Sequence, residues 1–208
     1  ECPTVLEAQV RELRLIAHHE PPYNRRSKRP TRLPWLRLTD EPLPRASIVR
    51  AVPREAAGIG PFSSRAQADH AAAALQELGL RACTRRLPAQ VSPSARGCFL
   101  GEVGRCSAPC VDQGAADAYR ALVARAQEMM THNPRPAFDH HLRRMRELAA
   151  EERYEEAARM RDQVRALLQG VYRWQRLSPW WDSTQTVAAR WSTDAYPSGA
   201  WEVVVARY

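Results

Sequence analysis

Four of the five cysteines in this 208-residue chain lie within one stretch of sequence. Cys83, Cys98, Cys106 and Cys110 follow a C-x14-C-x7-C-x3-C spacing, whereas Cys2 stands apart. No secretory signal opens the chain, and its composition is arginine-rich, which argues against a framework of structural disulfides. A structural zinc ion usually takes C-x2–4-C pairs, because a tight turn brings two thiolates onto one ion. A [4Fe–4S] cube is wider and accepts more open spacings, so the spacing leaves a cluster, zinc and unliganded thiols open.

The residues between these cysteines suit a shielded cluster. The apolar neighbours are expected to exclude water, namely Phe99, Leu100, Val103, Ala108 and Pro109, and Gly101 and Gly104 would let backbone amides approach the sulfurs. The isolated Cys2 is expected to be a small buried or free residue.

The charge of the chain predicts a nucleic-acid partner. The formal net charge is +8, from 31 basic and 23 acidic residues, and the sole lysine is Lys28. Arginine makes planar, bidentate contacts with phosphate. Residues 25–50 hold eight basic and two acidic residues, a net of +6, which predicts a phosphate-binding surface there.

The residues expected to bind DNA are Arg25, Arg26, Lys28, Arg29, Arg32 and Trp35, the tryptophan by packing on a base or sugar. A merely soluble loop and GC-rich codon usage are the alternatives.

Hydrophobic periodicity predicts an α+β chain. Helices are expected at about 5–19, 65–78 and 115–130, and a helical hairpin at about 138–170. Strands are expected within 35–39, 46–52, 184–191 and 200–208. Residues 58–64 are typical of a turn, and residues 84–97 of a loop. No run of about 18 apolar residues occurs, so no membrane span is predicted.

The predicted hairpin at 138–170 differs in charge from the basic region. It holds seven arginines and seven acidic residues, so its net charge is zero. A neutral amphipathic hairpin binds DNA poorly but is suited to pack against another helical hairpin. The candidate anchors for such a partner are Phe138, Leu142, Met145 and Tyr154. The alternative is an element that packs only within its own chain.

Four successive blocks resemble the UvrC family, the nuclease subunit of bacterial nucleotide excision repair. LEAQVRELRLIAHHEPPYN resembles the end of the family's GIY-YIG nuclease domain, and GIGPFSS resembles its G-P-F/Y turn, although an aromatic of the family's YFGP is lost. CFLGEVGRCSAPC resembles the family's cysteine segment, with Cys83 matching the upstream cysteine. MRELAAEERYEEAARMRDQV is similar to the UVR motif, the helical hairpin that docks UvrC onto UvrB.

The resemblance implies an α+β architecture of four parts. These are a truncated GIY-YIG nuclease domain tail, a four-cysteine cluster module, a UVR-like helical hairpin and the start of a ribonuclease-H-like β region. We assign them to residues 1–60 (with the basic loop and strands), 61–132, 133–172 and 173–208. The family's catalytic Tyr and Arg are expected before Glu1, and its ribonuclease-H-like acidic residues after Tyr208. The chain is therefore expected to be a segment of a longer protein.

The resemblance also implies a cofactor and partners. UvrC proteins are reported as [4Fe–4S] proteins, so Cys83, Cys98, Cys106 and Cys110 are expected to hold a 4Fe-4S cluster, with zinc as the alternative. The cluster would be structural and close to DNA rather than catalytic. The expected partners are damaged double-stranded DNA and a UvrB-like protein, in a cytoplasmic, nucleoid-associated protein that contacts no membrane.

Two residues match the nuclease site of the family. Glu12 matches the glutamate that binds one Mg²⁺ or Mn²⁺ ion in GIY-YIG nucleases, and Asn24 matches the asparagine that closes the site. A carboxylate can hold such an ion with several waters retained, and the ion polarises the phosphodiester. The simpler alternatives are a solvated helix glutamate and a turn residue beside Pro22.

The predicted function is therefore part of a metal-dependent excision nuclease, inactive as this segment alone. The alternative is a non-catalytic module that binds DNA and protein, within a larger protein that carries a DnaQ-type exonuclease in front.

Overall fold

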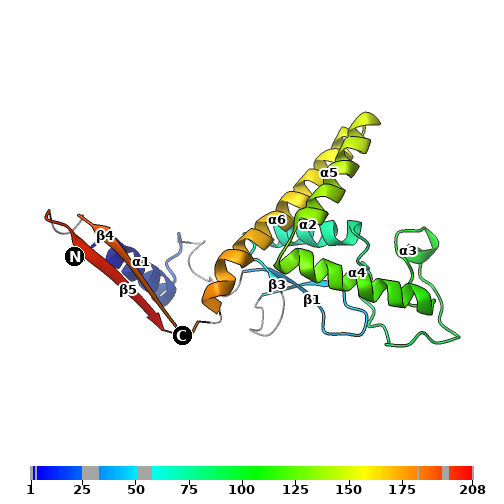
Figure 1. Ribbon diagram of the computed structural model, residues 1–208, viewed down its shortest axis with the longest axis horizontal. Helices are drawn as coiled ribbons and strands as arrows, with labels where there is room; N and C mark the ends of the chain where they lie inside the picture. The colour runs from blue at the N-terminus through cyan, green and yellow to red at the C-terminus, as the bar shows by residue number, and fades with distance from the viewer. Residues whose placement is uncertain are drawn as a thin grey trace. The chain divides into compact units, whose positions relative to one another are not determined.

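The computed structural model describes residues 2, 4–24, 33–50, 58–181, 183–193 and 197–207. The chain forms two compact units, which Figure 1 shows in ribbon form. Unit 1 combines residues 1–32 with 177–208, and unit 2 spans 33–176. Both contain helices and strands, so the α+β prediction is confirmed.

A small antiparallel sheet forms one layer of unit 2. Its strands β1 (Trp35–Leu38), β2 (Ala46–Val49) and β3 (Gly58–Ile59) lie in the order β2-β1-β3. Leu36 lies at the centre of the sheet, where it is paired with Ile48 of β2 on one side and with Ile59 of β3 on the other. Leu36 and Ile59 are fully buried, so the centre of the sheet faces the hydrophobic core.

Two helices build the other layer of this core. Helix α2 (Arg65–Glu77) begins at Ser64, whose hydroxyl accepts a hydrogen bond from the Gln67 N–H, as is typical of an N-cap. It buries a face made almost wholly of alanines, which lets the helix approach the sheet closely. Helix α4 (Gln113–Thr131) begins at Asp112 and buries Tyr119 and Met130. The short helix α3 (Phe99–Glu102) follows α2 and precedes α4 in the sequence.

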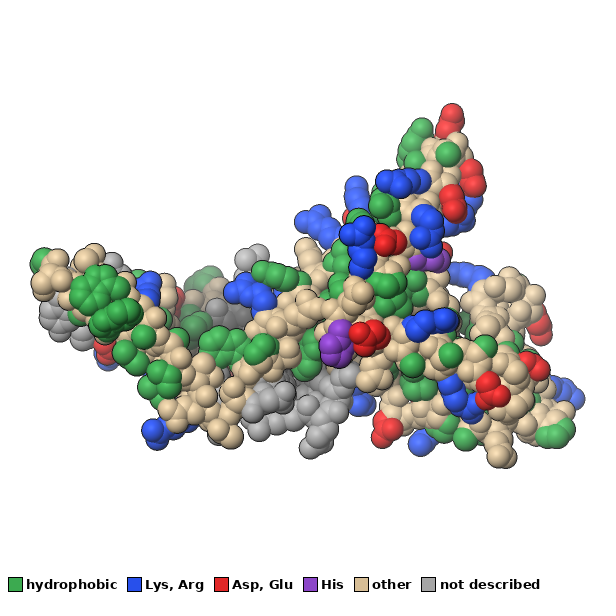
Figure 2. Space-filling model, in the orientation of Figure 1, with side chains coloured by type: hydrophobic (Ala, Val, Ile, Leu, Met, Phe, Trp, Pro, Cys, Tyr) green, Lys and Arg blue, Asp and Glu red, His purple; other side chains and the backbone are tan. Residues whose placement is uncertain are grey.

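Helices α5 (Arg135–Ala150) and α6 (Tyr154–Trp181) form the hairpin that the sequence predicts, although each helix extends beyond the expected range. Figure 1 shows them side by side, projecting from the body of unit 2. Leu148, Met160 and Val164 are buried within the hairpin. Basic and acidic side chains alternate along its surface (Figure 2), and several form ion pairs, such as Arg135 with Asp139.

The described residues of unit 1 form an N-terminal helix, the last residues of α6 and a pair of strands. Helix α1 (Val5–His19) begins at Thr4, whose hydroxyl accepts the Glu7 N–H at 3.1 Å, as is typical of an N-cap. Strands β4 (Gln185–Ser192) and β5 (Ala200–Arg207) pair antiparallel along their full length. A hollow of about 420 Å³ lies between the first turns of α1 and β5.

The structure differs from the expected domain boundaries at residue 60. Strands β1 and β2, assigned to the nuclease tail, pack on α2 and share its core, because Leu36 and Leu43 belong to the same cluster as Leu75. Residues 33–50 and 58–60 therefore belong with the cysteine region. Within the described part of the chain, no helix is long and apolar enough to cross a membrane.

A candidate four-cysteine site

The four clustered cysteines come together in unit 2. All four are half-buried free thiols. Burial raises the pKa of the Cys106 thiol above its usual value, and the charges of Cys83, Cys98 and Cys110 raise it further. Since such interactions act over short range, three separate stretches of the chain bring their sulfurs into one neighbourhood.

The segment from Cys98 to Cys106 is folded by its backbone. The Cys98 carbonyl accepts hydrogen bonds from the N–H groups of Gly101 at 2.8 Å and Glu102 at 3.1 Å, which forms α3. A Cβ atom on Gly101 would lie 3.1 Å from the Cβ of Ala108, so glycine allows α3 to pack on the Cys106–Cys110 turn. The Ala108 N–H also faces the Cys106 sulfur and lowers its pKa, against the larger effect of burial.

Cys110 and Cys83 are tied to the hydrophobic core. Cys110 packs against the buried cluster of unit 2, and the neighbouring Pro109 is fully buried. Asp112 then caps α4, accepting the Ala115 N–H at 2.6 Å. On the other side, the Nη1 of Arg81 donates to the Cys83 sulfur at 3.1 Å. The cysteines at the two ends of the motif are thus positioned by the core, and the loop between them carries the other two.

The donor set limits what this site could hold. One zinc ion needs its thiolates about 2.3 Å from a single point. Among the described residues, no three His, Cys, Asp or Glu side chains are placed to hold one metal ion. A cube with one thiolate on each iron accepts a wider arrangement. Four thiols with an N–H donor on one sulfur fit the ligand set of an iron–sulfur cluster.

Two expectations about this site are wrong, and one residue was missed. Phe99 is 71% exposed and Val103 is 46% exposed, so these side chains do not shield the sulfurs. They belong to a single helical turn and its C-cap, in which no residue is buried. Arg81 was missed because its position, two residues before a cysteine, does not distinguish it from the many other arginines.

The two candidate nuclease residues lie in unit 1. Glu12 is exposed on α1, and Asn24 is exposed in the turn that follows, where its N–H donates to the Pro21 carbonyl at 3.3 Å. The structure gives no hydrogen bond or ion pair to the Glu12 carboxylate within the described residues. The carboxylate is therefore accessible to an ion, and its metal-binding role stays a prediction.

The expected DNA-binding residues are only partly described. Arg25, Arg26, Lys28, Arg29 and Arg32 lie outside the described residues. Trp35, in contrast, is only 7% exposed and packs edge-on against Trp174, with the ring centroids 6.4 Å apart. The Trp35 side chain is therefore covered within unit 2, and its expected role in packing on a base or sugar stays a prediction.

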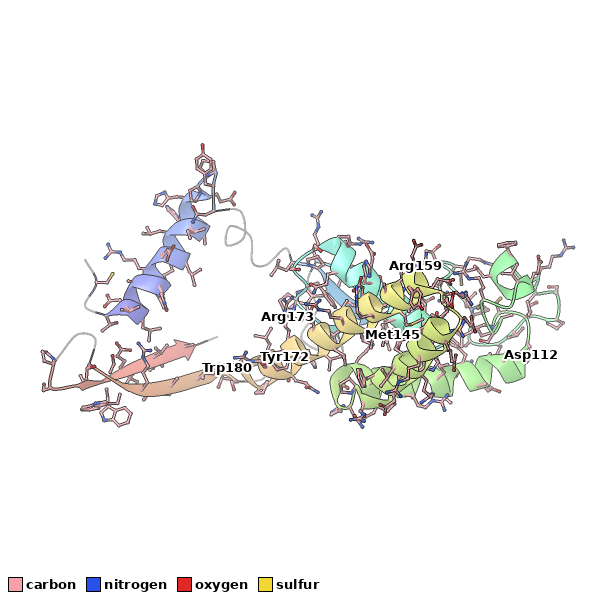
Figure 3. The ribbon with its side chains drawn as sticks, turned by 90° about the horizontal axis from the view of Figure 1, so that it is seen from above. Asp112, Met145, Arg159, Tyr172, Arg173 and Trp180 are labelled. Carbon is pink, nitrogen blue, oxygen red and sulfur yellow. The ribbon has the colours of Figure 1, made fainter. Side chains whose placement is uncertain are left out.

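The hairpin carries an apolar groove of about 380 Å³. Its lining residues are Phe138, Met145, Arg161, Val164, Arg165, Leu168, Gln169 and Tyr172. Figure 3 labels Met145 on α5 and Tyr172 further along α6. Phe138 and Met145 were predicted as anchors and line this groove. Leu142 is half-buried and Tyr154 is exposed, and neither lines it.

Comparison with known proteins identifies the unit that holds the cysteines. Residues 33–129 match the model of the UvrC/Cho excinuclease middle domain. The chain contains a UvrC middle domain. The four cysteines and Arg81 lie within the matched range, whereas α5 and α6 lie beyond it. No solved structure matches the chain.

Relatives of the chain agree with this assignment. A Mycobacterium tuberculosis protein named as a bifunctional exonuclease/endonuclease is 39% identical over 212 residues, covering 100% of this chain and 32% of its own length. The UvrABC system protein C of Methanosarcina mazei is 32% identical and covers 79% of the chain and 30% of its own length. The UvrABC system protein C of Haloarcula marismortui is 35% identical and covers 79% of the chain and 28% of its own length. The chain thus spans about a third, or less, of these relatives.

Proposed function

We propose that this region is the central part of a UvrC-type DNA repair nuclease, in which Cys83, Cys98, Cys106 and Cys110 hold a [4Fe–4S] cluster. The observation that carries the proposal is the gathering of four half-buried free thiols in unit 2, with the other three close enough to raise the pKa of Cys106. The cluster would join the β1–α2 core to the loop of residues 98–110, and its chemistry there would be structural. The match of residues 33–129 to the UvrC middle domain supports the same assignment.

Metal analysis of the full-length protein tests this proposal. Purified without oxygen, it should be brown and contain about four iron and four sulfide per chain. Cys106→Ser should lose most of the visible absorption, since it removes one of the four thiolates that would each cap an iron. Cys2→Ser is the matched control, because Cys2 lies in unit 1, and it should keep the wild-type spectrum. Stoichiometric zinc without iron or sulfide would overturn the cluster assignment.

The proposed reaction of the whole protein is metal-dependent hydrolysis of a phosphodiester beside a DNA lesion. The UvrC-type relatives support this reaction class, and the exposed carboxylate of Glu12 is accessible to an ion. Glu12 would hold Mg²⁺ or Mn²⁺, and Asn24, beyond the end of α1, would close the site. The basic run of residues 25–32 follows at once in the sequence and would bind the DNA backbone.

A matched pair of variants separates this role from its alternatives. Glu12→Gln in the full-length protein should lower incision of damaged duplex DNA by about 100-fold or more, since a catalytic ion contributes several kcal/mol. Glu7→Gln removes a carboxylate from the same helix but keeps the backbone N–H that Thr4 caps, and should cut normally. Unchanged incision by Glu12→Gln would favour the non-catalytic binding module.

The hairpin is proposed to dock a UvrB-like protein. Its groove is apolar, and its surface charges are largely paired with one another, such as Arg144 with Glu147 and Arg153 with Glu156. An apolar groove between two helices suits an amphipathic helical partner better than a phosphate backbone.

A further inference from the structure

The guanidinium group of Arg81 is fixed by contacts at all three nitrogens. Arg81 is 2% exposed. Its Nε donates to the Leu43 carbonyl at 2.9 Å, and its Nη2 lies 2.8 Å from a Glu41 carboxylate oxygen. Its Nη1 donates to the carbonyls of Cys83 at 3.0 Å and Arg85 at 2.7 Å, and to the Cys83 sulfur at 3.1 Å.

A second buried residue holds the backbone of Arg81. The Tyr119 hydroxyl accepts the Arg81 N–H at 3.1 Å and donates to the Pro44 carbonyl at 2.6 Å. The loop between β1 and β2, helix α4 and the Cys83 segment therefore meet at one arginine. Because an arginine fork has fixed geometry, these contacts leave Nη1 little freedom to leave the sulfur.

The hydrogen bond from the Arg81 Nη1 to the Cys83 sulfur would affect the charge on that sulfur. An N–H that donates to a ligand sulfur stabilises negative charge on it, and hydrogen bonds to the sulfurs are among the features that set the potential of an iron–sulfur cluster. Reduction adds one electron to the cluster and so increases this charge. Glu41 balances the charge of the guanidinium from the opposite side, at Nη2. The local effect on the sulfur is therefore that of a directed hydrogen bond.

We propose that Arg81 is a positioning residue of the cluster, which fixes the Cys83 sulfur through Nη1 and raises the reduction potential. This inference rests on the proposed cluster. The inference goes beyond the proposed cluster, because it assigns two roles to a buried side chain that is not a ligand. Arg81 would position the Cys83 sulfur and would raise the reduction potential of the cluster.

Redox titration of the full-length protein tests the proposal. Anaerobic protein is titrated with dithionite, which supplies the one electron that each cluster takes up, and the visible absorption is followed. Arg81→Lys keeps the positive charge beside Glu41 but loses the fork that reaches the sulfur. At the wild-type midpoint, the ratio of oxidised to reduced cluster should rise about tenfold, which is about 59 mV for a one-electron couple.

Glu41→Gln is the matched control, because it weakens the same buried network at Nη2 and leaves Nη1 on the sulfur. It should not shift the ratio toward the oxidised form. A wild-type potential in Arg81→Lys at full iron and sulfide content would overturn the role of Arg81 and leave the cluster intact. Absence of iron and sulfide from the wild-type protein would overturn the proposed cluster, and this inference with it.

A measurement on the wild-type protein decides the matter if Arg81→Lys does not fold. Protein labelled with ¹⁵N in the arginine guanidinium groups is reduced and examined by pulsed electron paramagnetic resonance. Among the described residues, Arg81 is the arginine that donates to one of the four clustered sulfurs. A ¹⁵N coupling to the reduced cluster is expected, and its absence would overturn the proposal.

Discussion

A Cβ atom on Gly170 would lie 2.5 Å from the Cζ atom of Phe62. Both residues are buried, and the Gly170 carbonyl also accepts the Gly60 N–H at 3.2 Å. The absence of a side chain at this point of α6 therefore lets the hairpin helix pack on the β3 end of the UvrC middle domain.

Gly170→Ala should accordingly destabilise the contact between α6 and β3. Helix propensity alone predicts a gain of about 1 kcal/mol, but overpacking of a rigid aromatic ring costs about 1–3 kcal/mol. We expect the cost to prevail, with faster hydrogen–deuterium exchange in peptides from both elements. Gly97→Ala is the control, since its Cβ would meet its nearest neighbour at 3.9 Å, an ordinary contact. Unchanged exchange in Gly170→Ala would show that Phe62 moves aside freely.

Tyr119→Phe should destabilise unit 2 by about 1–3 kcal/mol, because it leaves the Arg81 N–H and the Pro44 carbonyl without their shared partner. Urea unfolding at neutral pH measures this loss.

The stability of Tyr119→Phe relative to the wild type should also depend on pH in the alkaline range. Burial raises the pKa of Tyr119 to about 12, above its usual value of 10. The stability linked to the neutral hydroxyl is thus complete below about pH 10 and is lost as the pH rises toward 12.

The difference between wild type and Tyr119→Phe should therefore shrink across this alkaline range. Tyr23 is the control position, because it is exposed and Tyr23→Phe should change neither the stability nor its pH dependence. A constant difference up to pH 12 would contradict the buried, neutral hydroxyl.

Much of the architecture could be predicted from local signals. The start of α1 follows from Thr4, and α2 ends beside Gly79, which adopts a φ of 107° that favours glycine. Strand β3 was not predicted, since two residues have no detectable period and pair only because β1 lies beside them. The range of the hairpin was predicted too short, because Pro134 and Pro136 are compatible with a first helical turn.

In the candidate site, too, some residues could be predicted from the sequence and others could not. The four cysteines could be chosen from their spacing and their resemblance to UvrC, both of which lie in the sequence. Arg81 and Trp35 could not be assigned, because their roles depend on burial. An arginine in a basic chain is expected to face solvent or phosphate, yet Glu41 and three carbonyls hold Arg81 inside. A tryptophan beside a basic loop is expected to meet a base, yet Trp35 meets Trp174.

His141 should make the stability of unit 2 sensitive to acid. It is fully buried, and its Nδ1 donates to the Ala137 carbonyl at 2.7 Å. Burial lowers the pKa of this imidazole below 6.5; His140 adds to the decrease, and Glu77 opposes it. A depressed pKa means that the stability linked to the neutral ring is present above about pH 6.5 and is lost as the pH falls below it.

His141→Leu should therefore unfold with a weaker dependence on acid than the wild type, as measured by urea midpoints between pH 7.5 and 5. The Ala137 carbonyl keeps its helical hydrogen bond in this variant, so the loss of the ring donor should be tolerated. His140→Leu, at the neighbouring half-buried position, should retain most of the wild-type dependence. Equal acid sensitivity in wild type and His141→Leu would contradict the assignment.

Met145→Glu should weaken binding of the full-length protein to a UvrB-like partner. Met145 is half-buried and lines the apolar groove with Phe138 and Tyr172, so a carboxylate there would have to be desolvated on docking. Truncation or polar replacement of a central apolar anchor typically costs about 2 kcal/mol or more, which corresponds to a rise in Kd of about 30-fold. Ala149→Glu introduces the same residue on the same helix, at an exposed position outside the groove, and should bind normally. Calorimetry with the purified partner measures both values. An equal loss in the two variants would point to a general effect of charge, and unchanged binding in Met145→Glu would place the docking surface elsewhere.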